Sequence, residues 1–209
     1  MEDLLNEEFS EDFSILAEEE IRDGKKQICF RGIFTEADKF NRNLRIYPKA
    51  ILREACQQAI AAAKASGQPV FGELEHASDP KVHLERIAVT FPELTWNEEK
   101  GTLEGKAIPT LTEAGKTVEG LAKSGFKICF STRMTGKTKP MSNETKAELG
   151  IPLTEDVKEV VGPCKIISID VVGTPSCQDA VSDTVYEEKQ EEQKVNNNKS
   201  LKDVIDAVF

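Results

Sequence analysis

Short segments rich in β-branched and aromatic residues recur along most of this chain, and they restrict its fold more than any other feature. Segments of this kind, bounded by glycine, proline and polar clusters, are typical of β-strands. They occupy residues 27–34, 69–76, 84–91, 92–99, 102–110, 126–133 and 165–175. Two stretches favour helix instead: the alanine-rich stretch from Pro48 to about Ala65, which Gly67 follows, and Leu111 to Lys123. We therefore predict a domain made mainly of strands, with two helices.

The two ends of the chain depart from this pattern. Residues 1–24 are predicted to be an acidic arm, because the first twenty residues carry nine acidic side chains and no basic one. Apolar residues recur there at roughly helical spacing, which fits a solvated amphipathic arm, a removable segment or a docking helix. Residues 25–180 form the predicted globular domain, followed by a low-complexity linker at 181–199 and an amphipathic helix at 200–209. Within the domain, residues 135–163 form a long polar connection, which is usually functional or disordered.

Charge and cysteine content exclude several classes of function. The formal net charge is −10, so the chain is not expected to bind nucleic acid or anionic lipid. Its five cysteines are scattered and form no CxxC pair, which predicts reduced thiols in a cytosolic protein and neither disulfides nor a zinc site. No apolar run is long enough for a membrane span, and the acidic N-terminus is unlike a secretory signal. Phosphate-binding glycine motifs are absent as well, and no cofactor is expected.

Histidine is scarce, which limits where a general base can lie. His76 and His83 are the only two histidines. In the strand predicted at 69–76, alternation places Gly72, Leu74 and His76 on one face. A lone histidine is more often structural or exposed than catalytic, so both interpretations of His76 stay open.

Ser131 lies near the end of a predicted buried strand, a position that holds a nucleophile rigidly. Strand alternation places it on the same face as Lys127, Cys129 and Arg133. An ordinary strand-end serine is the alternative. Cys129 is a rival nucleophile, but burial would raise the pKa of its thiol and leave it unreactive.

Asp170 interrupts the apolar strand predicted at 165–175. It needs a partner, because an unpaired charge in such a strand is costly. Its carboxylate is suited to orienting the imidazole of His76, or to a structural ion pair with Arg133 or Arg45. Sequence alone does not choose between these two roles.

A metal site is an alternative for Glu73, Glu75 and His76, which supply carboxylate and imidazole groups within four residues. Their spacing does not place two ligands on one helical face, as HExxH does. Remote ligands would be needed, and no metal is expected.

Four segments, taken in order, resemble one protein family. They are GIFTEADKFNRNLRIYPK (Gly32–Lys49), GELEH (Gly72–His76), FSTR (Phe130–Arg133) and SIDVVGTPSC (Ser168–Cys177). Over roughly residues 27–180, their order and spacing resemble the prohead core proteases of T-even-type tailed bacteriophages. That family is similar in fold to the herpesvirus assemblin proteases. The resemblance implies an α+β fold: a mixed, mainly antiparallel β-barrel surrounded by helices.

The resemblance also implies a serine protease site, with Ser131 as nucleophile and His76 as base. In the assemblin pattern the third member is a histidine on a later strand, and no histidine follows His83 here. An acidic residue must substitute, or the site is a dyad. We expect Asp170 in this role, with Asp79 as the second choice.

Members of this family cleave scaffold and capsid proteins inside the immature head, and then themselves, after Glu in Leu/Ile-Xaa-Glu motifs. The resemblance thus implies phage scaffold or core proteins and the major capsid protein as substrates, a place in the host cytoplasm inside the prohead, and a homo-oligomer. Matching tripeptides in this chain are Leu5-Asn6-Glu7, Leu16-Ala17-Glu18, Leu52-Arg53-Glu54, Leu111-Thr112-Glu113 and Leu153-Thr154-Glu155. Helices resist proteolysis, and we expect self-cleavage after Glu18.

A preference for Glu requires a cationic group in the substrate pocket. A planar guanidinium holds a carboxylate with two hydrogen bonds, so Arg133 is the first candidate, followed by Lys127 and Lys137.

The leading interpretation is a serine endopeptidase of phage head maturation. The runner-up is a non-enzymatic scaffold or core component with the same fold, and a metal-dependent hydrolase is third.

Overall fold

The computed structural model describes residues 3–8, 16–22, 25–39, 41 and 44–172. Its elements are, in chain order, β1 (Asp3–Glu8), β2 (Leu16–Arg22), β3 (Lys25–Glu36), β4 (Arg45–Ile46), α1 (Lys49–Ser66), β5 (Val70–Glu73), the 3₁₀ helix η1 (Leu84–Arg86), β6 (Ile87–Asn97), β7 (Thr102–Pro109), α2 (Glu113–Lys123), β8 (Cys129–Pro140), α3 (Asn143–Glu148) and β9 (Lys158–Val172). No helix in these ranges is both long and apolar enough to cross a membrane. The predicted linker at 181–199 and helix at 200–209 lie outside the described residues.

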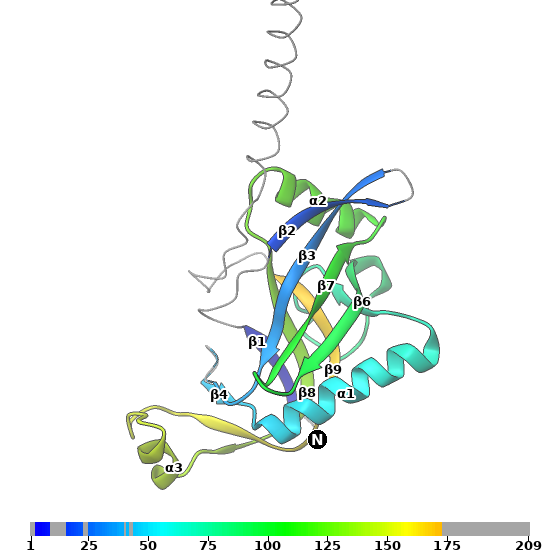
Figure 1. The fold of residues 1–209 in the computed structure, drawn as a ribbon. Helices are drawn as coiled ribbons and strands as arrows, with labels where there is room; N and C mark the ends of the chain where they lie inside the picture. The colour runs from blue at the N-terminus through cyan, green and yellow to red at the C-terminus, as the bar shows by residue number, and fades with distance from the viewer. Residues whose placement is uncertain (1–2, 9–15, 23–24, 40, 42–43, 173–209) are drawn as a thin grey trace, which may run out of the picture.

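The strands form two sheets (Figure 1). One has the order β1-β8-β9-β4 and the other β2-β3-β7-β6-β5. All neighbouring strands are antiparallel except β4 and β9. The predicted α+β class with mainly antiparallel strands is confirmed. The closed barrel is a correction, because among the described strands the two sheets stay separate and each keeps its edge strands. An isolated bridge between Leu74 and Val171 joins them.

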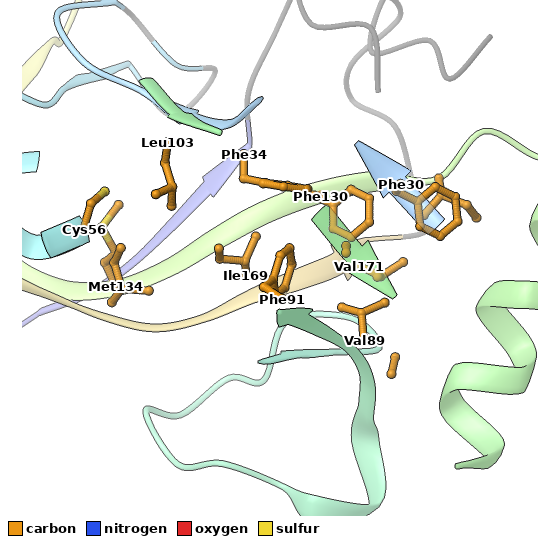
Figure 2. Close-up of a cluster of buried hydrophobic side chains, with 14 of the residues drawn as sticks. Phe30, Phe34, Cys56, Val89, Phe91, Leu103, Phe130, Met134, Ile169 and Val171 are labelled. Carbon is orange, nitrogen blue, oxygen red and sulfur yellow. The ribbon is translucent and has the colours of Figure 1, made fainter. Parts of the chain in front are cut away.

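Aromatic and aliphatic side chains from both sheets form the core (Figure 2). Phe30, Phe34, Phe91 and Phe130 come from β3, β6 and β8, and they meet edge to face with ring centroids 4.9 to 6.0 Å apart. Such ring pairs stabilise a core by roughly 0.5–1.5 kcal/mol each beyond the area they bury. The strand β8 that carries Ser131 is thereby fixed on one side by this core.

The two predicted helices are present. Pro48 directly precedes α1, and Gly67 ends it with φ +68°, a left-handed conformation that glycine adopts without steric cost. This helix packs against β9, β6 and β5. At α2, the Thr112 hydroxyl accepts a hydrogen bond from the Gly115 N–H and caps the helix.

The strands predicted at 84–91 and 92–99 are one strand, β6. Its register with β7 shifts between Thr90 and Glu93, around Pro92. Proline has no N–H for the ladder, so it is tolerated at such an irregularity. The two predicted segments are therefore one continuous strand with a local irregularity at Pro92.

Two parts of the predicted acidic arm are strands rather than a helix. β1 pairs antiparallel with β8, and β2 pairs antiparallel with β3. Within β2, Glu20 bonds to Lys106, and both Glu18 and Glu20 pair with Arg31. Arg31 on β3 and Lys106 on β7 thus offset part of the negative charge of β2.

The long polar connection at 135–163 is also largely ordered. β8 continues to Pro140, α3 follows, and β9 begins at Lys158. This end of the β8–β9 pair and α3 extend away from the rest of the molecule (Figure 1). A small apolar cluster of Ile46, Met141 and Val157 lies where β4, the end of β8 and the start of β9 adjoin the segment that carries α3.

Candidate active site

Strands β8 and β9 bring Ser131 and Asp170 together. The two residues are directly paired in the antiparallel register. Both are fully buried. Side chains opposite each other on neighbouring strands are close enough to interact, so the pairing alone places a hydroxyl beside a carboxylate.

His76 approaches this pair from the other sheet. The strand predicted at 69–76 ends at Glu73, and His76 lies in the loop that follows β5. The predicted alternation of Gly72, Leu74 and His76 along one strand is therefore corrected. Since His76 is not in a strand, loop contacts set the direction of its imidazole.

The three side chains form a hydrogen-bonded chain. His76 Nε2 lies 2.7 Å from Ser131 Oγ, and His76 Nδ1 lies 2.8 Å from Asp170 Oδ2. With Nδ1 protonated and donating to the carboxylate, Nε2 is free to accept the hydroxyl proton of the serine. The other carboxylate oxygen of Asp170 accepts the Glu73 N–H at 2.8 Å. Both oxygens of Asp170 are thereby held in place.

The guanidinium of Arg133 pairs with the carboxylate of Asp170. Its Nε lies 3.0 Å from Ser168 Oγ and 3.1 Å from Asp170 Oδ2, and its Nη2 lies 2.9 Å from a carboxylate oxygen of Glu73. The Arg133 side chain is fully buried. A guanidinium engaged in this way does not face a substrate, so the predicted role of Arg133 in the substrate pocket is corrected. The sequence left two roles open for Asp170, and its carboxylate makes both contacts.

Arg133 also forms hydrogen bonds with the loop that carries His76. Its Nη1 donates to the carbonyl oxygens of Asp79 and Lys81, at 3.1 and 3.4 Å. The Asp79 carboxylate accepts the Lys81 N–H at 2.8 Å and lies 3.7 Å from His83 Nε2. The second choice for the acidic member therefore lies beside the second histidine, whereas Asp170 contacts His76.

The remaining predicted residues occupy different surroundings. Lys127 is exposed and lies just before β8, and Lys137 is exposed further along that strand. Cys129, the rival nucleophile, is buried at the start of β8. Lys127 thus stays a candidate for the substrate pocket.

The residues considered for a metal site do not gather around one point. In the described ranges, one group of three potential ligands is close enough, namely Glu18, Glu20 and Cys29. Lys106 already bonds to Glu20 there and holds the pKa of that carboxyl below its usual value. Glu73 is engaged with Arg133, so the proposed set of Glu73, Glu75 and His76 is not assembled.

Comparison with known proteins identifies the family. Residues 12–191 match the family described as prohead core protein serine protease. The chain belongs to this family. The resemblance noted in its sequence is thereby confirmed.

Two relatives of this family illustrate the relationship. The chain is 26% identical over 140 residues to the prohead core protein protease of Enterobacteria phage T4, and the match spans 66% of each protein, just under two thirds. Its fold is similar to that of the bacteriophage T4 capsid assembly protease, gp21, with a TM-score of 0.65 at 21% identity, over 83% of this chain and 99% of that one. This second likeness establishes the fold alone.

Two contributors to the site were not assigned by the sequence. Glu73 was considered as a metal ligand, yet it pairs with Arg133 and its N–H fixes Asp170. Arg86 donates hydrogen bonds to the carbonyl oxygens of Leu74 and Glu75, just before His76. No pattern in the sequence around Arg86 predicts these contacts.

Proposed function

We propose that this chain is a serine endopeptidase of phage head maturation, in which Ser131 is the nucleophile. The observation that carries the proposal is the continuous chain of short contacts from Ser131 through His76 to Asp170. The family membership supports it independently.

In the proposed reaction, Ser131 Oγ attacks the scissile carbonyl carbon while His76 Nε2 takes the hydroxyl proton. The C–N bond then breaks, and the imidazolium gives that proton to the leaving amine. Water hydrolyses the acyl-enzyme by the same route, with His76 again as base. Asp170 stays ionised throughout and stabilises the imidazolium through Nδ1–H.

The edge of β8 is the proposed place for an extended substrate. β1 already pairs there, with Glu7 opposite Thr132 and Glu8 opposite Ser131. Peptides commonly bind by adding a strand to an exposed sheet edge, because the main chain then supplies the hydrogen bonds. While β1 stays in this position, it excludes another peptide from the same edge.

This register favours the first of the matching tripeptides as a site of self-cleavage. The bond between Glu7 and Glu8 follows Leu5-Asn6-Glu7 and lies at the strand position of Ser131. Glu18, the site expected from sequence, lies in β2 of the other sheet, opposite Cys29. We therefore propose cleavage after Glu7 within one molecule, and retain cleavage after Glu18 for a second molecule.

The proposed substrates are phage scaffold or core proteins and the major capsid protein, cut after Glu inside the prohead by an oligomer of this chain. Lys127 is the proposed cationic partner of the substrate Glu. The relatives support the setting, since one is named a prohead core protein protease and the other a capsid assembly protease.

Intact-mass spectrometry of wild-type and Ser131→Ala protein, incubated side by side, tests this proposal. We expect the wild type alone to lose N-terminal fragments that end in Glu. A peptide containing Leu-Asn-Glu should be cut as well, and its Leu-Asn-Gln counterpart much more slowly. A chelator should leave both rates unchanged.

Equal processing of wild-type and Ser131→Ala protein would show that another nucleophile acts. Stable full-length mass in both proteins, together with no cleavage of the peptide after residues 1–8 are deleted, would favour the non-enzymatic scaffold component.

A further inference from the structure

The backbone just before His76 adopts an uncommon conformation. Glu75 has φ +63°, in the left-handed region that residues other than glycine rarely enter. Such residues persist only where their surroundings hold them, and they cluster at functional sites. Glu75 is exposed and directly precedes the imidazole that contacts Ser131 and Asp170. Something must therefore hold this residue in place.

Main-chain hydrogen bonds provide part of the stabilisation of Glu75. The Leu74 N–H donates to the Arg86 carbonyl at 2.8 Å, and the Glu75 N–H donates to the Val171 carbonyl at 2.7 Å. Leu74 also forms the bridge to Val171 that joins the two sheets. These bonds fix the N–H groups of Leu74 and Glu75 and leave the carbonyl groups of the same two residues to another donor.

The Arg86 side chain is that donor. Its Nε and Nη2 lie 3.2 and 2.7 Å from the Leu74 carbonyl oxygen, and Nη2 lies 2.7 Å from the Glu75 carbonyl oxygen. In an extended residue, successive carbonyl groups point to opposite sides of the chain. Two successive carbonyls can converge on one guanidinium only when the residue between them, Glu75, is not extended.

The guanidinium of Arg86 is itself anchored. Its Nε lies 3.9 Å from Glu73 Oε2. The other oxygen of Glu73 pairs with Arg133 and accepts the His83 N–H at 2.9 Å. Arg86 thus spans from a fully buried carboxylate, Glu73, to the exposed turn that precedes His76.

We propose that Arg86 is a positioning residue: by holding the left-handed backbone of Glu75, it aims the His76 imidazole at Ser131 and Asp170. This inference rests on the proposed function, because it assigns His76 the role of base. Without Arg86, Glu75 relaxes toward the conformations that residues with a Cβ prefer, and the imidazole leaves its position between hydroxyl and carboxylate. The left-handed penalty shifts such a backbone equilibrium by roughly 5- to 30-fold.

Kinetics of four variants test the proposal. We expect Arg86→Gln to lower kcat for a Leu-Asn-Glu peptide by roughly 10-fold or more, on the scale of that penalty, with KM little changed. Arg53→Gln is the matched control, because Arg53 is another partly exposed arginine paired with a glutamate, on α1. Adding Glu75→Asn to Arg86→Gln should recover about 5-fold, because asparagine tolerates the left-handed region, whereas adding Glu75→Ala should recover nothing.

Nuclear magnetic resonance supplies a readout that does not need activity. The chain has two histidines, so ¹⁵N-histidine spectra are simple to assign with a His83→Gln variant. In the wild type we expect His76 to show one tautomer, protonated at Nδ1. Arg86→Gln should give mixed tautomers at His76, and Glu75→Asn should restore the single one.

The proposal is overturned if Arg86→Gln keeps the wild-type kcat, or if kcat falls while the His76 spectrum stays unchanged. Loss of activity that Glu75→Asn and Glu75→Ala rescue equally would also overturn it. If Arg86→Gln does not fold, Arg86→Lys replaces it, and its single ammonium should give a partial loss with the same rescue. A protein that cuts no peptide even after residues 1–8 are deleted, with His76 spectra responding as described, would refute the proposed function and leave the positioning role standing.

Discussion

Asp170 contacts three other residues of the candidate site, more than Ser131 or His76 does. Its two carboxylate oxygens contact His76 Nδ1, the Glu73 N–H and the Arg133 guanidinium. A charge buried this deeply is tolerated only when it is paired and hydrogen-bonded. The same contacts also fix the direction of the carboxylate beside the imidazole, which the proposed triad requires.

Asp170→Asn should abolish most activity while preserving the shape of the site. An asparagine at the third position of a serine triad favours the wrong histidine tautomer and lowers kcat by about 10⁴-fold in a well-studied protease. We expect a loss of roughly 10³- to 10⁴-fold in peptide cleavage, measured at equal fraction folded by circular dichroism. Asp79→Asn is the matched control and should stay within a few fold of wild type. A large loss for Asp79→Asn with a small loss for Asp170→Asn would reverse the assignment.

At the scale of elements, the pairing of β2 with β3 shows how an acidic segment is incorporated into a sheet. Arg31 on β3 pairs with Glu18 and Glu20 on β2 and with Glu93 on β6. Its hydrogen bonds to Glu93 and Glu20 raise the pKa of its guanidinium. Exposed ion pairs of this kind each contribute little, typically below about 1 kcal/mol. The strand is therefore held mainly by its ladder, and the charges favour this pairing over alternatives.

Cys29 on β3 makes this pairing sensitive to alkaline pH. Burial, with the carboxylate of Glu20 nearby, raises the pKa of its thiol from 9.0 to about 11. The folded state thus binds this proton more tightly, and the resulting stability is complete below pH 9.0 and is lost as pH rises through about 11. Urea unfolding from pH 8 to 11.5 should show a steeper alkaline decline for wild type than for Cys29→Ala. Parallel curves would mean that the thiol ionises normally.

At the scale of the whole molecule, the two sheets meet where β5 crosses β9. Gly72 lies at this crossing, and a Cβ atom there would be 1.8 Å from the Ile169 carbonyl oxygen and 2.8 Å from Val89 Cγ2. Only a residue without a side chain allows the sheets to approach this closely. The approach also sets the distance from the Glu73 N–H to Asp170, and so connects the packing of the sheets to the site.

Gly72→Ala should therefore destabilise the fold by about 3 kcal/mol or more, because a backbone carbonyl cannot move aside cheaply. Gly120→Ala is the matched control: Gly120 lies in α2, and beyond its own helix backbone and chain neighbours no atom lies within 4 Å of the added methyl group. That change should stabilise the protein by about 0.5–1 kcal/mol. Urea unfolding monitored by circular dichroism measures both. Similar free energies of unfolding for the two variants would contradict the close crossing.

The sequence determined the local structure wherever one segment carried its own signal. Alternating β-branched and aromatic residues predicted β3, β7, β8 and β9, and the alanine-rich segment between Pro48 and Gly67 predicted α1. The scarcity of histidine, a serine on a predicted buried strand and an acidic residue in an apolar strand named His76, Ser131 and Asp170 as candidates, and the family resemblance implied the catalytic roles of Ser131 and His76. These signals are local, because they depend on the spacing of side chains along one strand or helix.

Only the tertiary structure decided how these segments combine. The acidic N-terminal residues have a helical spacing, yet β1 and β2 are strands because sheet edges and cations of distant segments accept them. Arg133 is close to Ser131 in sequence, but its guanidinium faces Asp170 and Glu73 in the interior. The left-handed Glu75 and the reach of Arg86 depend on contacts between residues more than ten positions apart. Such long-range pairings leave no periodic trace in the sequence, since their energy comes from groups that meet only after folding.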